Sequence, residues 1–143
     1  MSKVISAIFW ALVGIFVVIA TYFAIPSPVS VKRGLFPFIA VLGIVFFLLG
    51  VALIVLTLKS KLKGKLKKFL LLTGISSAGF LVSVILHNFV YGLFIVLFDA
   101  DFWSRIGVSD EPVFLIIAMF VCPIVFLIGV VGSIILFNKK RRK

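Results

Sequence analysis

The chain has 143 residues, of which 64% are hydrophobic and 13% are charged, and its net charge is +11. An ordinary soluble domain is about 45–50% apolar and about 25% charged, so this composition excludes a soluble fold and predicts an integral membrane protein. The basic residues cluster in loops and in the tail rather than on a soluble face, which argues against nucleic acid as a partner.

Four apolar runs are each long enough to span a membrane as a helix, because about 20 residues at 1.5 Å per residue cross about 30 Å of hydrocarbon. The runs cover residues 4–24, 36–58, 69–98 and 113–137, and none contains an aspartate, glutamate, lysine or arginine. We therefore expect an all-α fold, a single domain of four transmembrane helices in an antiparallel up-down bundle.

The first run is longer than the apolar region of a signal peptide, which predicts an uncleaved helix. Proline lacks the amide proton, so the sequence Ile-Pro-Ser-Pro at 25–28 should end this helix. Pro37 is expected in the first turn of the second helix. The loop at 59–68 follows, and Gly64 in its middle allows the chain to reverse direction.

The third run would form a helix of about 45 Å, which exceeds the hydrocarbon core, so it must tilt, protrude or break near Gly92. Ser109 or Asp110 is the expected N-cap of the fourth helix. Inside that helix Pro123 predicts a kink that frees the carbonyl of Met119.

The distribution of charge predicts the orientation, because basic loops next to membrane spans stay in the cytoplasm. Twelve of the fifteen basic residues lie at the N-terminus, in the loop 59–68 and in the tail 138–143, whereas all four acids lie in the third loop. We expect both termini inside, in the plasma (inner) membrane of a bacterium or archaeon. The residues expected to contact anionic lipid headgroups are Lys59, Lys61, Lys63, Lys65, Lys67, Lys68, Lys139, Lys140, Arg141 and Arg142.

Nearly all the polarity within the spans lies on the third helix. Its candidate ligand-binding residues are Ser83, His87, Asn88 and Tyr91. An ionisable residue within a span is a functional candidate, although His87 is expected near the outer headgroups, where polar side chains are tolerated. The alternative interpretation is a neutral histidine that ties the third helix to the outer loops by hydrogen bonds.

The third loop, residues 99–112, contains the four acids. We expect them to be solvated and to cap helices. Their spacing does not match an EF-hand, so a divalent cation is the weaker alternative. Arg105 is expected either to pair with one of the acids or, with Lys32 and Arg33, to meet lipid phosphates. Phe102, Trp103 and Ile106 suit a half-turn that lies on the outer surface.

The chain has one cysteine, Cys122, which predicts no internal disulfide and no cysteine-based metal site. We expect a non-enzymatic structural, accessory or interaction subunit without cofactor or metal, whose partners are anionic lipids and a second copy or another membrane protein. The first alternative is a carrier, channel or receptor for an uncharged or lipidic ligand at the outer end of the third helix. The second is a lipid-acting enzyme with His87 as base, partnered by Asp99 or Asp101.

Overall fold

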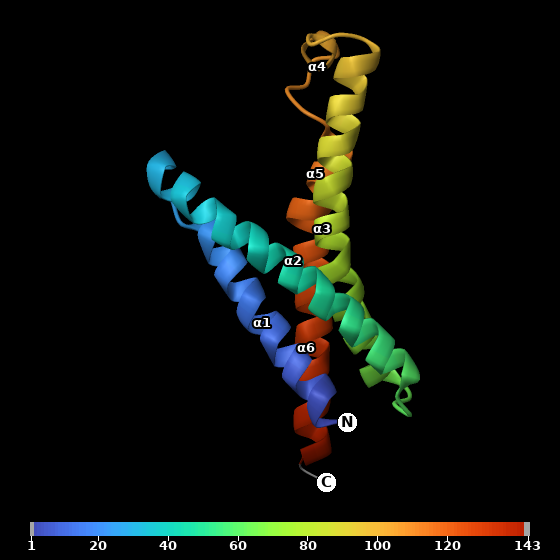
Figure 1. The fold of residues 1–143 in the computed structure, drawn as a ribbon. Coiled ribbons are helices and arrows are strands. Elements are labelled where there is room, and N and C mark those ends of the chain that lie inside the picture. The colour runs from blue at the N-terminus through green and yellow to red at the C-terminus, as the bar shows by residue number, and fades with distance from the viewer. Residues whose placement is uncertain (1, 142–143) are drawn as a thin grey trace.

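The structure is a computed structural model that describes residues 2–141, and this part of the chain is helical almost throughout and contains no strand (Figure 1). The elements are α1 (Lys3–Ala24), α2 (Val29–Lys59), α3 (Lys65–Leu97), α4 (Phe102–Arg105), α5 (Pro112–Ile116), the π-helix η1 (Ile117–Val121) and α6 (Cys122–Arg141). The last three form one continuous helix. Four helices are long and apolar enough to cross a membrane, which confirms the predicted all-α fold with four apolar helices.

The second helix begins earlier than its apolar run. α2 starts at Val29, directly after the N-cap residue Pro28, so only residues 25–28 connect it to α1. Pro37 consequently lies inside the helix, and the prediction that it occupies the first turn is wrong. The error has a physical cause: a helix continues beyond the bilayer wherever its hydrogen bonds allow, whereas hydropathy marks only the part in lipid.

The third helix is unbroken across its 33 residues, so it is about 50 Å long and Gly92 does not interrupt it. It begins after Gly64, whose φ of 72° lies in the left-handed region that glycine adopts at little cost. The chain reversal at the basic loop is therefore short, and only residues 60–64 lie outside α2 and α3.

The disturbance predicted around Met119 takes the form of a π-helix. Pro123 has no amide proton to donate, and its ring crowds the carbonyl of Met119, four residues earlier. The helix widens into η1 immediately before this proline and returns to α geometry at Cys122. Such π-turns are one of the recognised ways in which a helix accommodates an inserted or missing hydrogen-bonding group.

The helices form two hairpins that cross, α1 with α2 and α3 with the last helix (Figure 1). The N-terminus, residues 60–64 and the end of α6 lie together, and we call this the basic end. The loop that holds α4 and the four acids lies at the opposite, acidic end. Toward the acidic end the α1–α2 hairpin leans away from α3.

Glycine and serine bring α2 and α3 close together at the crossing. A Cβ atom on Gly50 would lie 2.8 Å from Ser77 Oγ, and one on Gly74 would lie 2.9 Å from the carbonyl oxygen of Gly50. Ser77 Oγ donates a hydrogen bond of 2.7 Å to the carbonyl oxygen of Phe46. Small residues of this kind let membrane helices pack backbone against backbone, where lipid provides no hydrophobic driving force.

The contact between α3 and α6 is equally close. A Cβ atom on Gly129 would lie 2.5 Å from Thr73 Oγ1 and 3.0 Å from the carbonyl oxygen of Phe69. The fully buried core lies around these helix contacts and includes Phe9, Leu12, Leu53, Leu70 and Phe126. Many large apolar side chains instead point outward on all four long helices, as expected of a lipid-facing surface.

Candidate functional site

A polar cluster at the acidic end joins α3 to the segment before α5. His87 Nδ1 lies 3.0 Å from the carbonyl oxygen of Glu111 and 3.3 Å from Glu111 Oε2. On the other side of the ring, His87 Nε2 lies 3.5 Å from Asp110 Oδ2. Both ring nitrogens therefore face acceptors, so the imidazole has a hydrogen-bond partner whichever nitrogen carries the proton.

Glu111 is buried, with 3% of its surface exposed, and it is the N-cap of α5. Its Oε1 accepts hydrogen bonds from the backbone amides of Val113 at 2.7 Å and Phe114 at 3.2 Å. The positive end of the helix favours a carboxylate at this position. The predicted caps, Ser109 and Asp110, are wrong: Pro112 is the first helical residue, and the residue directly before it does the capping.

Aromatic contacts hold the third loop against the end of α3. The Trp103 ring stacks on Tyr91 with centroids 5.8 Å apart, and its indole N–H donates a 3.2 Å hydrogen bond to the Tyr91 carbonyl. The expected half-turn is the helix α4, but Trp103 is buried in it rather than lying on the surface, while Ile106 is exposed. Arg105 pairs with Asp99 at 2.8 Å, as predicted for one of the acids.

The four predicted site residues have different surroundings. Ser83 is buried in α3, and the Asn88 amide is exposed and donates to the carbonyl of Val84 in its own helix. Tyr91 belongs to the aromatic contact with α4. Of the four, only His87 meets acidic side chains.

The acids that contact His87 are not the ones that the sequence suggested. Asp110 and Glu111 take this place, whereas Asp99 pairs with Arg105. The order of residues along α3 carries no information about which end of a 14-residue loop returns to it, so this pairing had no signal in the sequence. Within the described residues, no group of three or more histidine, cysteine, aspartate or glutamate side chains is arranged to hold a metal ion.

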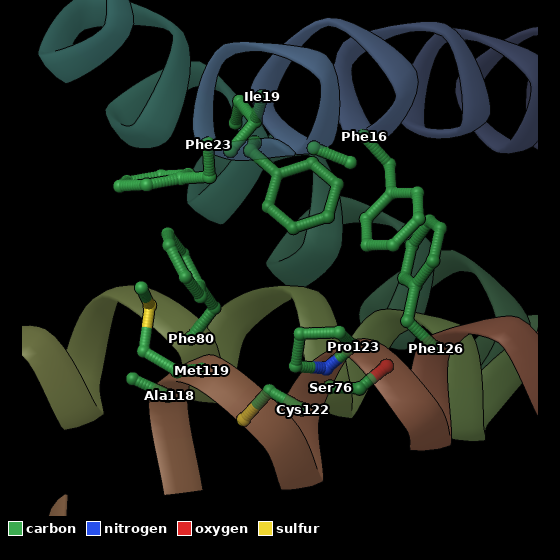
Figure 2. Close-up of a pocket in the computed structure, with 12 residues that line it drawn as sticks. Phe16, Ile19, Phe23, Ser76, Phe80, Ala118, Met119, Cys122, Pro123 and Phe126 are labelled. Carbon is green, nitrogen blue, oxygen red and sulfur yellow. The ribbon is translucent and has the colours of Figure 1, made fainter. Parts of the chain in front are cut away.

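A second feature, absent from the sequence-based expectations, is an apolar cavity between the hairpins (Figure 2). It has a volume of about 190 Å³, is partly open, and is lined by residues of α1, α2, α3, η1 and α6. Phe16 and Phe126 stack at its base with centroids 4.5 Å apart. No periodicity reveals such a cavity, because it arises where helices far apart in sequence diverge after crossing.

The lysines predicted to contact lipid lie on both sides of the reversal at residues 60–64. Lys59 ends α2, and Lys65, Lys67 and Lys68 lie in the first turn of α3. Lys67 Nζ donates to the carbonyl oxygen of Leu58 at 3.5 Å, and the other loop lysines are exposed. Lys139 is exposed near the end of α6, whereas Arg142 and the side chains of Lys140 and Arg141 lie outside the described residues.

No known protein family matches the chain, and comparisons with curated proteins and with solved structures find no match. The function is therefore argued from the polar cluster, the cavity and the distribution of charge in this chain.

Proposed function

We propose that the protein is a non-enzymatic integral membrane protein that acts as a structural, accessory or interaction subunit. The observation that carries this proposal is the engagement of Glu111, the one buried carboxylate among the described residues, which both caps α5 and contacts His87. A general base needs room for a substrate within hydrogen-bond reach. Here the groups around His87 are used to close the third loop onto α3.

The proposed arrangement in the membrane is an antiparallel up-down bundle with both termini inside, in the plasma membrane of a bacterium or archaeon. In support, the start of α1, residues 60–64 and the end of α6 lie at one end of the molecule, and most of the basic residues belong to these segments and their flanks. The loop that holds α4 and the four acids lies at the other end (Figure 1). An asymmetry of this size favours a single orientation, because basic segments resist translocation.

Anionic lipid headgroups are the proposed partner of the basic end. A lysine or arginine near a membrane surface that carries anionic lipid contributes about 1 kcal/mol of attraction. The lysines of residues 59–68 are exposed or partly exposed and have no acidic neighbour within the loop. The proposed protein partner is a second copy of the chain or another membrane protein.

Orientation is tested with single-cysteine reporters in a background that carries Cys122→Ala. Lys63→Cys reports on the basic end and Ser104→Cys on the acidic end. We expect a membrane-impermeant maleimide to label Ser104→Cys in intact cells or spheroplasts and to label Lys63→Cys only after lysis. The reverse pattern, or equal labelling of both reporters in intact cells, would contradict the proposed orientation.

Lipid preference is tested by native mass spectrometry after reconstitution in equal amounts of phosphatidylglycerol and phosphatidylcholine. We expect the protein to retain phosphatidylglycerol in excess. A variant with all six loop lysines changed to glutamine should lose this excess, while the control with Lys32 and Arg33 changed to glutamine, at the other end, should keep it. Equal retention of both lipids by the unaltered protein would remove the lipid part of the proposal.

The enzyme alternative has one observation in its favour, the presence of Asp110 and Glu111 beside His87. It predicts that lipids incubated with the purified protein are converted to new products and that His87→Gln abolishes this conversion. We expect no turnover dependent on His87 when the lipids are followed by mass spectrometry. Turnover lost in His87→Gln would replace the present proposal with a lipid-acting enzyme.

The carrier, channel or receptor alternative places an uncharged or lipidic ligand at the outer end of α3. Two cavities, one between the hairpins and one between α1 and α2, are lined by other residues. A ligand bound at the predicted position would be displaced by Ser83→Phe, and retention of co-purifying lipid is the measurement. We expect retention to be unchanged.

A further inference from the structure

The cavity between the hairpins lies within the apolar part of the helices, just beyond the crossing of α2 and α3. Phe16 and Phe23 reach it from α1, and Phe80 reaches it from α3 (Figure 2). Ala20 and Ala118 also line it, and their short side chains leave its centre unfilled. The cavity therefore exists because α1 diverges from η1 and α6 faster than side chains of this size bridge the gap.

The lining offers almost no hydrogen bonds to an occupant. The only hydroxyl, Ser76 Oγ, already bonds to the carbonyl oxygens of Leu72 at 2.8 Å and Thr73 at 3.1 Å in its own helix. The Cys122 thiol is a weak donor. A buried water needs about two to four polar partners, so this cavity favours hydrocarbon over water.

The size and opening of the cavity restrict the occupant further. An apolar cavity of about 150 Å³ is known to bind a molecule of the size of benzene, and this one has about 190 Å³. A helix with its side chains is about 10–12 Å across and is too wide to enter. Phe23 and Met119 lie on the same side of the cavity and are 46% and 41% exposed, so the opening faces the surroundings of the helices (Figure 2).

We propose that this cavity binds the terminal part of one lipid acyl chain, which enters from the bilayer past Phe23 and Met119. A hydrocarbon chain matches the lining chemically, is thin enough to enter, and surrounds the opening at high concentration in any bilayer. Methionine and phenylalanine at the opening suit an adaptable apolar contact. The bound chain fills the space between the hairpins and links α1 to η1, two elements that otherwise diverge.

The test uses the full chain in phosphatidylcholine nanodiscs that contain a phosphatidylcholine with a diazirine near the end of one acyl chain. The zwitterionic headgroup keeps the result independent of the basic end. After illumination, the adducts are located by mass spectrometry. Cys122 and Phe126 are 8% and 2% exposed, so only a chain inside the cavity reaches them, whereas Ile128, 51% exposed, reports on ordinary surrounding lipid.

The variant Ala20→Phe fills the cavity from α1, and Ala11→Phe is the matched control because Ala11 is also exposed on α1 but does not line the cavity. We expect adducts on Cys122 and Phe126 in the unaltered protein and in Ala11→Phe. In Ala20→Phe these adducts should fall at least about tenfold relative to the adducts on Ile128, because the added ring occupies the cavity. A tenfold loss corresponds to binding that is weaker by about 1.4 kcal/mol.

Ala118→Leu, which fills the cavity from η1, should lower the same adducts and takes the place of Ala20→Phe if that variant does not fold. Cavity adducts that persist in a folded variant of either kind, or that are absent while Ile128 is labelled, would overturn the proposal. A parallel experiment with a free fatty acid that carries the same diazirine separates the sources. Labelling of the cavity by the fatty acid but not by the phospholipid would overturn the proposal and assign the cavity to a free fatty acid instead.

Discussion

The two halves of the molecule are held together in different ways. In the half next to the basic end, α2, α3 and α6 meet at Gly50, Gly74 and Gly129. At these glycines the backbones come close together, beside the side chains of Ser77, Ile54 and Thr73. In the half next to the acidic end, the hairpins separate, aromatic rings line a cavity, and a charged cluster fastens the third loop to α3. The first half relies on shape and the second on polar contacts and a proposed lipid chain.

This difference follows from the solvent that surrounds the helices. Lipid chains are as apolar as leucine, so apolar side chains gain little by leaving lipid and helices associate where small residues allow close van der Waals contact. Beyond the crossing no such glycine pair joins α1 to α3, and the hairpins diverge. At the acidic end, polar contacts act as structural forces, as in the cluster of His87 with Asp110 and Glu111.

The largest expected effect on stability comes from a substitution in the half next to the basic end, which we call the crossing half because α2 and α3 cross there. Gly129→Ala places a Cβ atom 2.8 Å from the backbone nitrogen of Thr73, and backbone cannot move aside as a flexible side chain does. We expect the free energy of unfolding in micelles to fall by about 1–3 kcal/mol. The control is Gly14→Ala, because a Cβ atom there has no neighbour within 4 Å. Equal losses in both variants would mean that the close contact does not hold the helices together.

The next effect is at the acidic end. Glu111→Ala removes the cap of α5 and one partner of His87, and we expect unfolding to become easier by about 1–2 kcal/mol. Asp101→Ala is the control because Asp101 is exposed and its side chain makes no capping bond to α4. Hydrogen exchange of residues 99–116 shows whether the loss is local. Unchanged exchange in Glu111→Ala would contradict the role of the cluster in fastening the loop.

Two buried serines in the crossing half should respond with opposite signs. Among the described residues Ser133 Oγ is buried without a hydrogen-bond partner, so Ser133→Ala should raise the free energy of unfolding by about 1 kcal/mol. Ser77 Oγ donates across the crossing to Phe46, so Ser77→Ala should lower it by about 0.6 kcal/mol. Thermal unfolding of the two variants in the same micelle makes the comparison, and a shift of the same sign in both would contradict this assignment.

The smallest effect is expected at the loop surface. Arg105 and Asp99 form an ion pair of 2.8 Å, but their side chains are 59% and 46% exposed. Exposed pairs contribute little because water and salt screen them, so Arg105→Ala should change stability by less than about 0.5 kcal/mol. The loss should be smaller at high salt than at low salt, because salt screens the pair in the unaltered protein. A larger loss would place this pair among the contacts that hold the loop.

The sequence predicted the four helices well because span length and apolarity are local properties that each run carries by itself. How these helices pack was not predicted, because the close contacts at Gly50 and Gly129 join residues that lie far apart in the sequence. The start of α2 was missed because Lys32 and Arg33 lie just before the apolar run 36–58, yet the helix includes them and begins at Val29.

The site was only partly predictable. His87 was identified because a histidine within an apolar run has a physical cost that invites explanation. Its partners Asp110 and Glu111 lie 23 and 24 residues away across a loop whose path depends on Trp103 packing against Tyr91. The cavity depends on the angle at which two hairpins cross, a tertiary property that no single helix encodes.

The length of α3 has a consequence for the membrane itself. The apolar run 69–98, nearly all of which lies in α3, is about 45 Å long as a helix and exceeds the roughly 30 Å of hydrocarbon. Such hydrophobic mismatch costs a fraction of a kcal/mol per Å. Because α2 is locked across it at Gly74, a tilt of α3 has to carry the other hairpin with it. A change in bilayer thickness that alters the tilt of α3 should therefore move both hairpins. Thick bilayers should relieve the mismatch more than thin ones.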